Sequence, residues 1–491
     1  MGLMRFLVAA PEHIAEETLA EAYMSGIDRT PWPVQTSLEG SLLLLEREVS
    51  ESANVHVPWV VAGHGLLTLA TGTLIEQSQP YLLPVELARG TINQLRNQLF
   101  DWQMIGLSVP AGVTEKLVEA IGHFSWAAVQ QDEPEVAATL SQQALAAALD
   151  ASQLLASAYA EQALTVRRRG TGKLASLLGA DLENWLLDTA TAKHFLATFN
   201  TAVVPICWRE VEASEGEFSW AVSDSQIEWC RVHGIKVCAG PLIQLDARSL
   251  PDWLFLWEDD FDNLTASMAE FMRAAVTRYR GKVDLWQGAG RLNTADVLPL
   301  SEEERLQLAA RAIKLVHTLD PDTPVLISLD QPWSEYMSRR EIDFPPLHFA
   351  DALVRAGLEL KGLILEVNLG CGANCTLPRT PLEFSRQLDY WSLLGLPLYL
   401  AITVPSGTGE DALAQRRVTL PPGTCTPHSQ QAWIARYVPL ILAKPAVQGI
   451  LWNQLRDSVP HDFPHGGLLD ERCQAKPALR TLAAIRQTLL K

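Results

Sequence analysis

Short apolar runs alternate with helical segments through roughly the last two thirds of this chain, and this alternation constrains the fold more than any other feature. Each run is a continuous Val/Ile/Leu-rich stretch, which is typical of strands buried on both faces of a parallel sheet. The runs are 177–182, 202–208, 235–243, 283–286, 324–330, 362–368, 397–404 and 447–452. Helix start signals lie between them, such as the capping box Ser301 to Glu304. Eight such units predict an α/β fold, a (β/α)8 TIM barrel over residues 171–491.

Residues 1–170 do not show this alternation. Three β-type runs, 5–9, 41–46 and 66–75, are separated by glycine turn signals. They predict a β-rich, sandwich-like N-terminal domain over 1–110, with one helix near 12–23. Residues 111–170 are rich in Ala, Leu, Glu and Gln, with apolar residues at helical spacing. This pattern predicts a helical hairpin that packs as a spacer between the two domains.

Charge and composition exclude several classes of partner. The net charge is −18, which argues against nucleic acid and anionic membranes, because both attract cationic surfaces. The N-terminus has no long apolar core of a secretory signal, and the apolar stretch 144–164 contains Asp150 and Glu161. Seven cysteines at irregular spacing fit reduced thiols. We therefore expect a cytoplasmic protein that does not enter a membrane.

We expect no cofactor and no metal. His461 and His465 are four residues apart, but Pro464 excludes a helix that would bring them to one face. Cys371 and Cys375 lack a second ligand pair of suitable spacing, so free thiols are the favoured interpretation.

Five segments of the predicted barrel carry a family resemblance. They are FNTAVVPICWREVEASEGEFSW (199–220), LPDWL (250–254), RYRGKVDLW (278–286), SLDQ (328–331) and WNQLRDSVPHDFPHGGLLDERCQAKPAL (452–479). In this order, and at these strands, they resemble glycoside hydrolase family 10, the xylanase family. The resemblance spans about 172–491 and implies a TIM barrel descended from enzymes that hydrolyse O-glycosyl compounds. The first 170 residues lie outside it.

The resemblance also implies where the catalytic groups would lie. Retaining glycosidases use one carboxyl group as acid/base and a second as nucleophile. The matching positions here are Arg291 and Ile402. An arginine does not give up a proton at neutral pH, and an isoleucine cannot form a glycosyl ester. The sequence therefore predicts that the family's mechanism is lost, and whether the chain is an enzyme stays open.

Side chains at the predicted strand ends suit a carbohydrate ligand. Indole rings stack on pyranose faces, and amides and guanidinium groups bond sugar hydroxyls. The candidates are Trp208, Trp286, Gln287, Arg291, Asn293, Asn368, Trp452, Asn453, Gln454 and Arg456. Trp452 is the first choice for stacking, although a place in the barrel core explains it equally well.

Two acids, Asp330 and Glu366, end the fifth and sixth predicted strands. They are the weak catalytic candidates, as a relocated acid pair, but an ion pair with Arg291 is the favoured interpretation. Three hypotheses follow. The chain is a non-hydrolysing saccharide-binding pseudoenzyme of carbohydrate metabolism with an oligo- or polysaccharide ligand, a glycosidase with relocated carboxylates, or a protein-interaction scaffold. An open barrel mouth favours binding, a free carboxylate pair favours catalysis, and a plugged mouth favours a scaffold.

Overall fold

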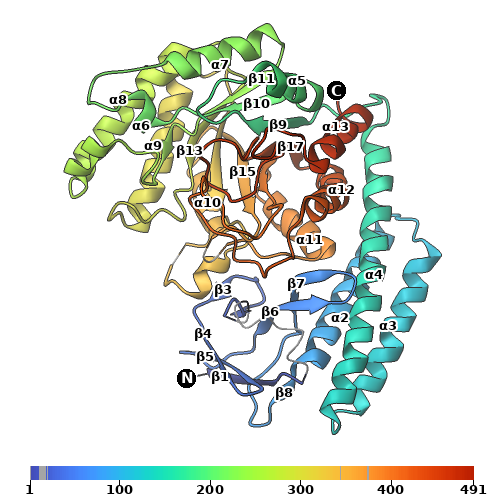
Figure 1. The fold of residues 1–491 in the computed structure, drawn as a ribbon. Helices are drawn as coiled ribbons and strands as arrows, with labels where there is room; N and C mark the ends of the chain where they lie inside the picture. The colour runs from blue at the N-terminus through green and yellow to red at the C-terminus, as the bar shows by residue number, and fades with distance from the viewer. Residues whose placement is uncertain (1, 10–17, 19, 343, 373–374) are drawn as a thin grey trace.

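The structure is a computed structural model that describes residues 2–9, 18, 20–342, 344–372 and 375–491 (Figure 1). Within these residues, eight parallel strands pair side by side and close into a barrel when β17 pairs with β9. The strands are β9 (Leu177–Asp181), β10 (Thr201–Val204), β11 (Lys236–Ala239), β13 (Leu285–Gly290), β14 (Val325–Asp330), β15 (Leu360–Asn368), β16 (Leu398–Thr403) and β17 (Val447–Trp452). A two-residue strand, β12 (Ile243–Gln244), extends the edge of β13. The predicted (β/α)8 barrel is confirmed.

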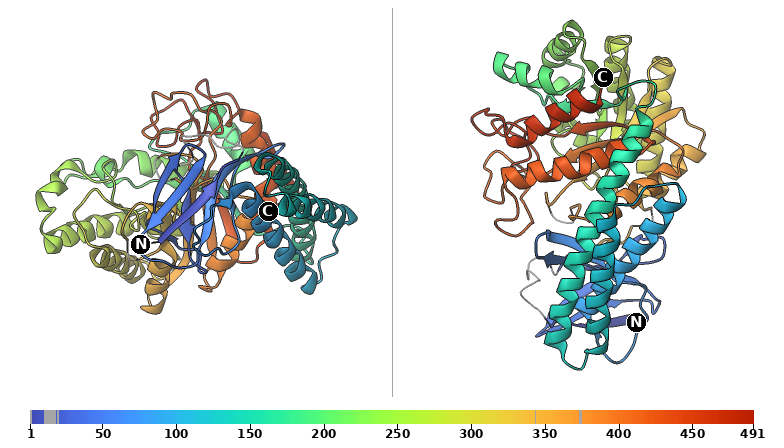
Figure 2. Two further views of the ribbon diagram at one scale, coloured as in Figure 1. Left: turned by 90° about the horizontal axis from the view of Figure 1, so that it is seen from below. Right: turned by 90° about the vertical axis from the view of Figure 1, so that its right-hand side faces the viewer.

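Helices surround the barrel as an outer layer (Figures 1 and 2). They are α5 (Thr189–Thr198), α7 (Ala221–Val232), α8 (Phe261–Tyr279), α9 (Glu302–Leu319), α10 (Pro346–Arg355), α11 (Pro381–Ser392), α12 (Pro427–Ala443) and α13 (Pro477–Leu489). The predicted capping box at Ser301 and Glu304 is formed at the start of α9. Among the described helices, none combines the length and the apolar run that a membrane span requires.

The side chains of each barrel strand alternate between two apolar clusters. Those that point inward form a small separate cluster made by residues such as Val203, Leu326 and Ile364. Those that point outward join the large core between the strands and the helices. This alternation decides which side chains of a strand end reach the barrel mouth, and in β13 an irregularity between Gln287 and Ala289 shifts it by one residue before Arg291.

The N-terminal region contains two four-stranded sheets, in the orders β4-β5-β1-β8 and β3-β2-β6-β7. The strands are β1 (Gly2–Leu7), β2 (Tyr23–Ser25), β3 (Pro31–Trp32), β4 (Gln35–Glu39), β5 (Leu42–Arg47), β6 (Asn54–Val61), β7 (Gly65–Ala70) and β8 (Tyr81–Leu82). Inward side chains of both sheets belong to one core. The predicted β-rich region is confirmed. The helix expected near 12–23 lies mostly outside the described residues, and Tyr23 begins β2.

Three helices follow the sheets, where the sequence predicts a hairpin from residue 111. They are α2 (Leu83–Met104), α3 (Ala111–Val129) and α4 (Pro134–Arg167). The predicted hairpin corresponds to α3 and α4. Helix α2 lies inside the range expected to be β-rich, because its apolar residues pack on the N-terminal core. The long helix α4 runs along one side of both the sheets and the barrel rather than between them (Figure 2).

A buried ion pair of the barrel contacts the N-terminal sheets through Tyr23. Arg379, just before α11, donates from Nη2 to Glu335 Oε1 at 2.7 Å and to Tyr23 Oη at 2.8 Å. Both charged side chains are 2% exposed. Burial raises the pKa of Tyr23 to about 12, with Arg379 opposing, so its hydroxyl stays protonated. Nearby, the backbone N–H of Thr68 donates to Pro378 O at 2.7 Å.

Replacing Glu335 by alanine should destabilise the protein strongly, because it leaves the Arg379 guanidinium buried without a counterion. We expect the free energy of unfolding to fall by about 3 kcal/mol, measured in urea by circular dichroism. The control is Asp296→Ala, which removes the exposed ion pair with Arg340 and should cost less than about 1 kcal/mol. Equal losses in the two variants would contradict this account of the junction.

Candidate functional site

An open cleft of about 600 Å³ lies at the carboxyl ends of the barrel strands. Its floor is made by inward-facing residues of several strands, including Asp181, Val203, Gln287, Glu366 and Ala401. The loops after β9, β10 and β17 form its walls. Because the carboxyl ends of parallel strands meet at one rim, the chemistry of a barrel of this kind lies there. The mouth is therefore not plugged.

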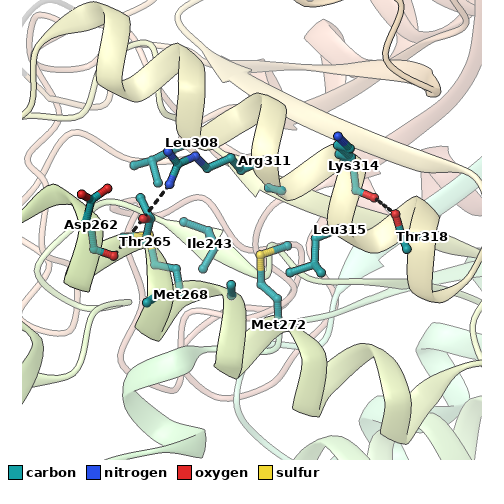
Figure 3. Close-up of a pocket in the computed structure, with 13 residues that line it drawn as sticks. Ile243, Asp262, Thr265, Met268, Met272, Leu308, Arg311, Lys314, Leu315 and Thr318 are labelled. Carbon is teal, nitrogen blue, oxygen red and sulfur yellow. Dashed lines mark hydrogen bonds between the residues drawn. The ribbon is translucent and has the colours of Figure 1, made fainter.

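A second cavity, of about 500 Å³, lies between α8 and α9 on the outside of the barrel (Figure 3). Methionine and leucine side chains such as Met268, Met272 and Leu308 line it. Its polar groups bond one another, as Arg311 Nη1 donates to Thr265 Oγ1 at 2.7 Å. Asp262, Arg311 and Lys314 line this groove beside the apolar side chains, but it lies away from the strand ends, so the barrel mouth is the candidate site.

Arg291 occupies the centre of the mouth, directly after β13. Its Nε lies 2.7 Å from Glu366 Oε2, and its Nη1 lies 3.4 Å from Asp462 Oδ2. The side chain is 13% exposed. Burial opposes its charge, but Glu366, Asp330 and Asp462 together raise the pKa of Arg291 well above its usual range. The predicted pairing of Arg291 with a strand-end carboxylate is confirmed for Glu366, and the contact with Asp462 is an addition that the sequence analysis missed.

Further contacts fix both carboxylates. Ser328 Oγ donates to Glu366 Oε1 at 2.6 Å, and Arg248 pairs with Asp462. Burial alone would raise the pKa of Asp462, but Arg291 and Arg248 lower it below its usual value. Asp462 is therefore ionised at neutral pH, and both carboxylates are held in place as hydrogen-bond acceptors.

The seventh barrel strand, β16, brings no carboxylate to the cleft. Ile402, which the resemblance matches to the nucleophile, is fully buried in the outer core. Its neighbour Ala401 faces inward and lines the cleft. The alternation of the strand therefore turns residue 402 away from the mouth, which corrects the expected position.

The three predicted tryptophans are core residues. Trp208, Trp286 and Trp452 are 2%, 0% and 1% exposed. Each indole N–H donates to a protein acceptor at 2.7–2.9 Å. Only Trp208 touches the cleft. The expectation that Trp286 and Trp452 stack on a sugar is wrong, because their faces are covered by core side chains.

Three predicted polar residues are brought together around Asp330, where they satisfy one another. Asn293 Nδ2 donates to Asp330 O at 2.8 Å, and Asn368 Nδ2 lies 3.5 Å from Asp330 Oδ1. Asn453 donates to Asn368 Oδ1 at 2.8 Å. Asp330 is 3% exposed and does not line the cleft, so it and Glu366 do not form a free acid pair there.

Of the remaining predicted residues, Gln454 and Arg456 form hydrogen bonds with other side chains, and Gln287 does not. Gln454 donates to Asp457 at 2.9 Å, and Arg456 Nε lies 3.3 Å from Glu183 Oε2. Gln287 is 6% exposed and lines the cleft. Within the described part of the chain, its side-chain amide makes no hydrogen bond. Gln287 is therefore the predicted amide that remains available to a ligand.

The loop after β9 supplies residues that the sequence analysis missed. Asp181 ends this strand, and one of its oxygens accepts from the backbone N–H of Glu183 at 2.6 Å. Burial raises the pKa of Asp181 to about 7, and Asp462 and Glu366 add to the rise. Burial also raises the pKa of Glu183 to about 8, against the opposing charge of Arg456. The sequence does contain a signal for Asp181, because it is an acidic residue at the end of the first predicted strand.

Trp185 stands on the same loop and is 47% exposed on the cleft wall. The buried Gln226 of α7 fixes the loop from behind. Its Nε2 donates to Glu183 O at 2.7 Å and to Trp185 O at 3.0 Å. The aromatic face that the cleft presents is thus Trp185, held on a braced loop.

The two histidines considered as a metal pair both face one carboxylate. His461 Nε2 lies 3.0 Å from Asp411 Oδ2, and His465 Nδ1 lies 3.7 Å from the same oxygen. These contacts tie the loop after β16 to the loop after β17. Across the described residues, no group of three or more metal-ligating side chains is assembled.

Arg291→Ala should destabilise the barrel by about 3 kcal/mol, because Glu366 and Asp462 would lose their shared cation in a largely buried site. The measurement is the shift of the urea midpoint. Arg248→Ala is the matched control, since Arg248 also pairs with Asp462 but its side chain is 40% exposed, and it should cost less than about 1 kcal/mol. An Arg291→Ala midpoint equal to that of the parent protein would contradict the prediction.

Comparison with known proteins gives a family match for the first part of the barrel. Residues 173–288 match the model of glycosyl hydrolase family 10. No curated protein matches the chain.

Solved structures that match this chain include the native xylanase 10B from Thermotoga maritima, with 15% identity, a TM-score of 0.48, and coverage of 64% of this chain and 95% of that chain. The xylanase 10B from Thermotoga petrophila RKU-1 in complex with xylobiose has 14% identity and a TM-score of 0.48, and the match covers 67% of this chain and 96% of that chain. A family 10 protein from Paenibacillus barcinonensis has 17% identity and a TM-score of 0.47, and the match covers 66% of this chain and 99% of that chain. Residues 173–288 are therefore similar to glycosyl hydrolase family 10, the family that the five sequence segments resemble.

Proposed function

We propose that the barrel binds an oligosaccharide in the mouth cleft and does not cleave it by the double displacement of retaining glycosidases. The observation that carries the proposal is the combination of an open cleft with an engaged carboxylate pair. The cleft volume of about 600 Å³ lies within the range of small-molecule sites. Glu366, the strand-end acid that faces it, is bonded to Arg291 and Ser328.

Two groups in the cleft suit a sugar ring. Trp185 offers a half-exposed indole face, on which the C–H face of a pyranose can stack. Gln287 is a largely buried residue on the cleft floor, and its amide has no partner within the described residues, so it can bond a sugar hydroxyl. Because Gln226 braces the Trp185 loop, little ordering of that loop is needed on binding.

Double displacement needs a nucleophilic carboxylate and a protonated acid about 5–5.5 Å apart across the sugar. Arg291 stands after the fourth barrel strand and is itself bonded to Glu366, so neither residue is free to act on a substrate. The seventh strand presents Ala401 to the cleft. These positions support binding without covalent catalysis.

A second candidate function is a glycosidase whose carboxylates have moved. One observation favours it, namely that Asp181 lines the cleft with a pKa raised to about 7, which suits a general acid at neutral pH. Asp181 is better placed for this role than Asp330, which lies outside the cleft. The two functions differ in whether a bound oligosaccharide is released intact.

Isothermal titration calorimetry with xylo- and cello-oligosaccharides tests the binding proposal. We expect Trp185→Ala to weaken the affinity for the ligand about tenfold or more, because it removes the stacking face, a loss of about 1.4 kcal/mol. The control is Trp257→Ala, since Trp257 is 36% exposed but does not line the cleft, and it should leave the affinity unchanged. Equal affinities of the parent protein and Trp185→Ala would contradict the proposed site.

The same oligosaccharides should be recovered intact after long incubation, as measured by the absence of new reducing ends. A mechanism-based xylobioside inhibitor should label no carboxylate, because Arg291 and Ser328 hold Glu366. Covalent labelling of any residue in the cleft would overturn the non-hydrolytic part of the proposal and favour the relocated-carboxylate enzyme.

A further inference from the structure

The mouth cleft is lined by more acidic than basic side chains. Six acidic residues line it, against two arginines, Arg248 and Arg291, and one histidine, His461. The acids are Asp181, Glu183, Glu210, Asp246, Glu366 and Asp462. A cleft with this imbalance attracts cations and repels anions, because its low-dielectric walls focus the field of the side chains.

Ion pairs account for only half of these acids. Glu366 and Asp462 share Arg291, and Glu183 pairs with Arg456. The other three form no ion pair with any described residue.

Each of the three has a distinct environment. Asp246 accepts backbone N–H groups at 2.9 and 3.1 Å and a bond from Gln244. Asp181 accepts one backbone N–H through Oδ1, and no described donor reaches its second oxygen. Glu210 is exposed at the rim. The cleft therefore holds three carboxyl groups that form no direct ion pair with a described cation, although the charge of Arg291 acts on Asp181 and Asp246 from a distance.

An independent feature of the same cleft indicates a ligand. Gln287 is only 6% exposed and lines the cleft, and its amide makes no hydrogen bond within the described residues, so it is available to a ligand that enters the cleft. Trp185, on the wall, offers an aromatic face, which attracts cations as well as sugar C–H groups. Both lie in the cleft that contains the unpaired carboxylates.

On the basis of the saccharide binding proposed above, we propose that the ligand is an amino-sugar oligomer with protonated, unacetylated amino groups, one of which meets Asp181. An ammonium group supplies the missing cation and donates three hydrogen bonds to carboxylate oxygens. The pyranose ring stacks on Trp185, and a hydroxyl satisfies Gln287. Sugars that carry carboxylates or phosphates are disfavoured by the same acids.

A basic peptide would meet the charge but not the rest of the site. Lysine side chains bring ammonium groups on flexible stems, which lose more rotamer entropy on binding than a sugar ring does. They bring neither a pyranose face for Trp185 nor a hydroxyl for Gln287. The combination of charge, aromatic wall and buried amide therefore favours the amino sugar.

Proton binding at Asp181 gives the interaction a pH dependence. The groups that face this carboxyl are Glu183, Asp462, Glu366 and Arg291, and burial together with the acids raises its pKa to about 7. Below that pH the carboxyl is neutral and attracts an ammonium weakly. Affinity for the amino sugar should therefore rise from pH 6 towards pH 7, until the amine itself loses its proton.

Three β-1,4-linked tetrasaccharides with the same ring skeleton provide the test by calorimetry at low salt. They are the tetramers of glucosamine, N-acetylglucosamine and glucose. We expect the glucosamine tetramer to bind about tenfold tighter than the other two. This advantage should shrink in 0.5 M salt, because the Debye length there is only a few ångströms and the charges are screened. Asp181→Asn should reduce the advantage to about threefold or less.

Two further variants make the result specific. Glu210→Gln, at the exposed rim, should weaken glucosamine binding less than Asp181→Asn, and it tests the charge even if Asp181→Asn folds poorly. Asp259→Asn is the matched control, because it changes the net charge equally at an exposed residue that does not line the cleft. It should leave the preference intact.

The outcomes separate this inference from the proposed function. Equal binding of the three tetrasaccharides would overturn the amino-sugar inference and leave saccharide binding standing. Binding of none of them, nor of the xylo-oligosaccharides, would overturn both. A tetralysine peptide that binds as tightly as the glucosamine tetramer would show that only charge is recognised, and it would also overturn the amino-sugar inference.

Discussion

The guanidinium of Arg291 holds together the barrel mouth. It joins the end of the fourth strand to Glu366 on the sixth and to Asp462 on the loop after the eighth. Without it, Glu366 and Asp462 would be neighbouring like charges in a largely buried part of the mouth, an arrangement that costs several kcal/mol. The cleft keeps its shape because one cation serves two carboxylates. For the same reason, the acids that this cation does not reach are left for a ligand.

The backbone of the mouth is strained where it carries these groups. Glu183, Arg291, Gln331 and His465 have φ between 48° and 57°, in the left-handed region that non-glycine residues rarely adopt. They lie on loops after the first, fourth, fifth and eighth strands. Such strain costs about 1–3 kcal/mol per residue and persists where surrounding contacts overdetermine it, as at binding sites.

The sequence predicts the barrel well because strands buried on both faces leave continuous apolar runs. The predicted fourth strand ends at residue 286, whereas β13 continues to Gly290. The apolar pattern stops early because glycines make up part of the last four residues of the strand and have no side chain. The pairing of Arg291 with Glu366 is predictable from the rule that strand ends meet. The contact with Asp462 is not, because that residue lies on a long loop whose path depends on tertiary packing. The burial of Trp452 depends on the same loop, whose Gly466 carbonyl accepts its indole N–H.

The central claim, that the Arg291–Glu366 ion pair organises the barrel mouth, is tested most directly by the coupling energy between the two residues in a double-mutant cycle. The cycle compares the free energies of unfolding of the parent, Arg291→Ala, Glu366→Ala and the double variant. If the ion pair organises the mouth, the double variant loses less stability than the two single losses combined, with a coupling of about 1–3 kcal/mol. Losses that add to within about 0.5 kcal/mol would contradict the account, because the two side chains would then act independently.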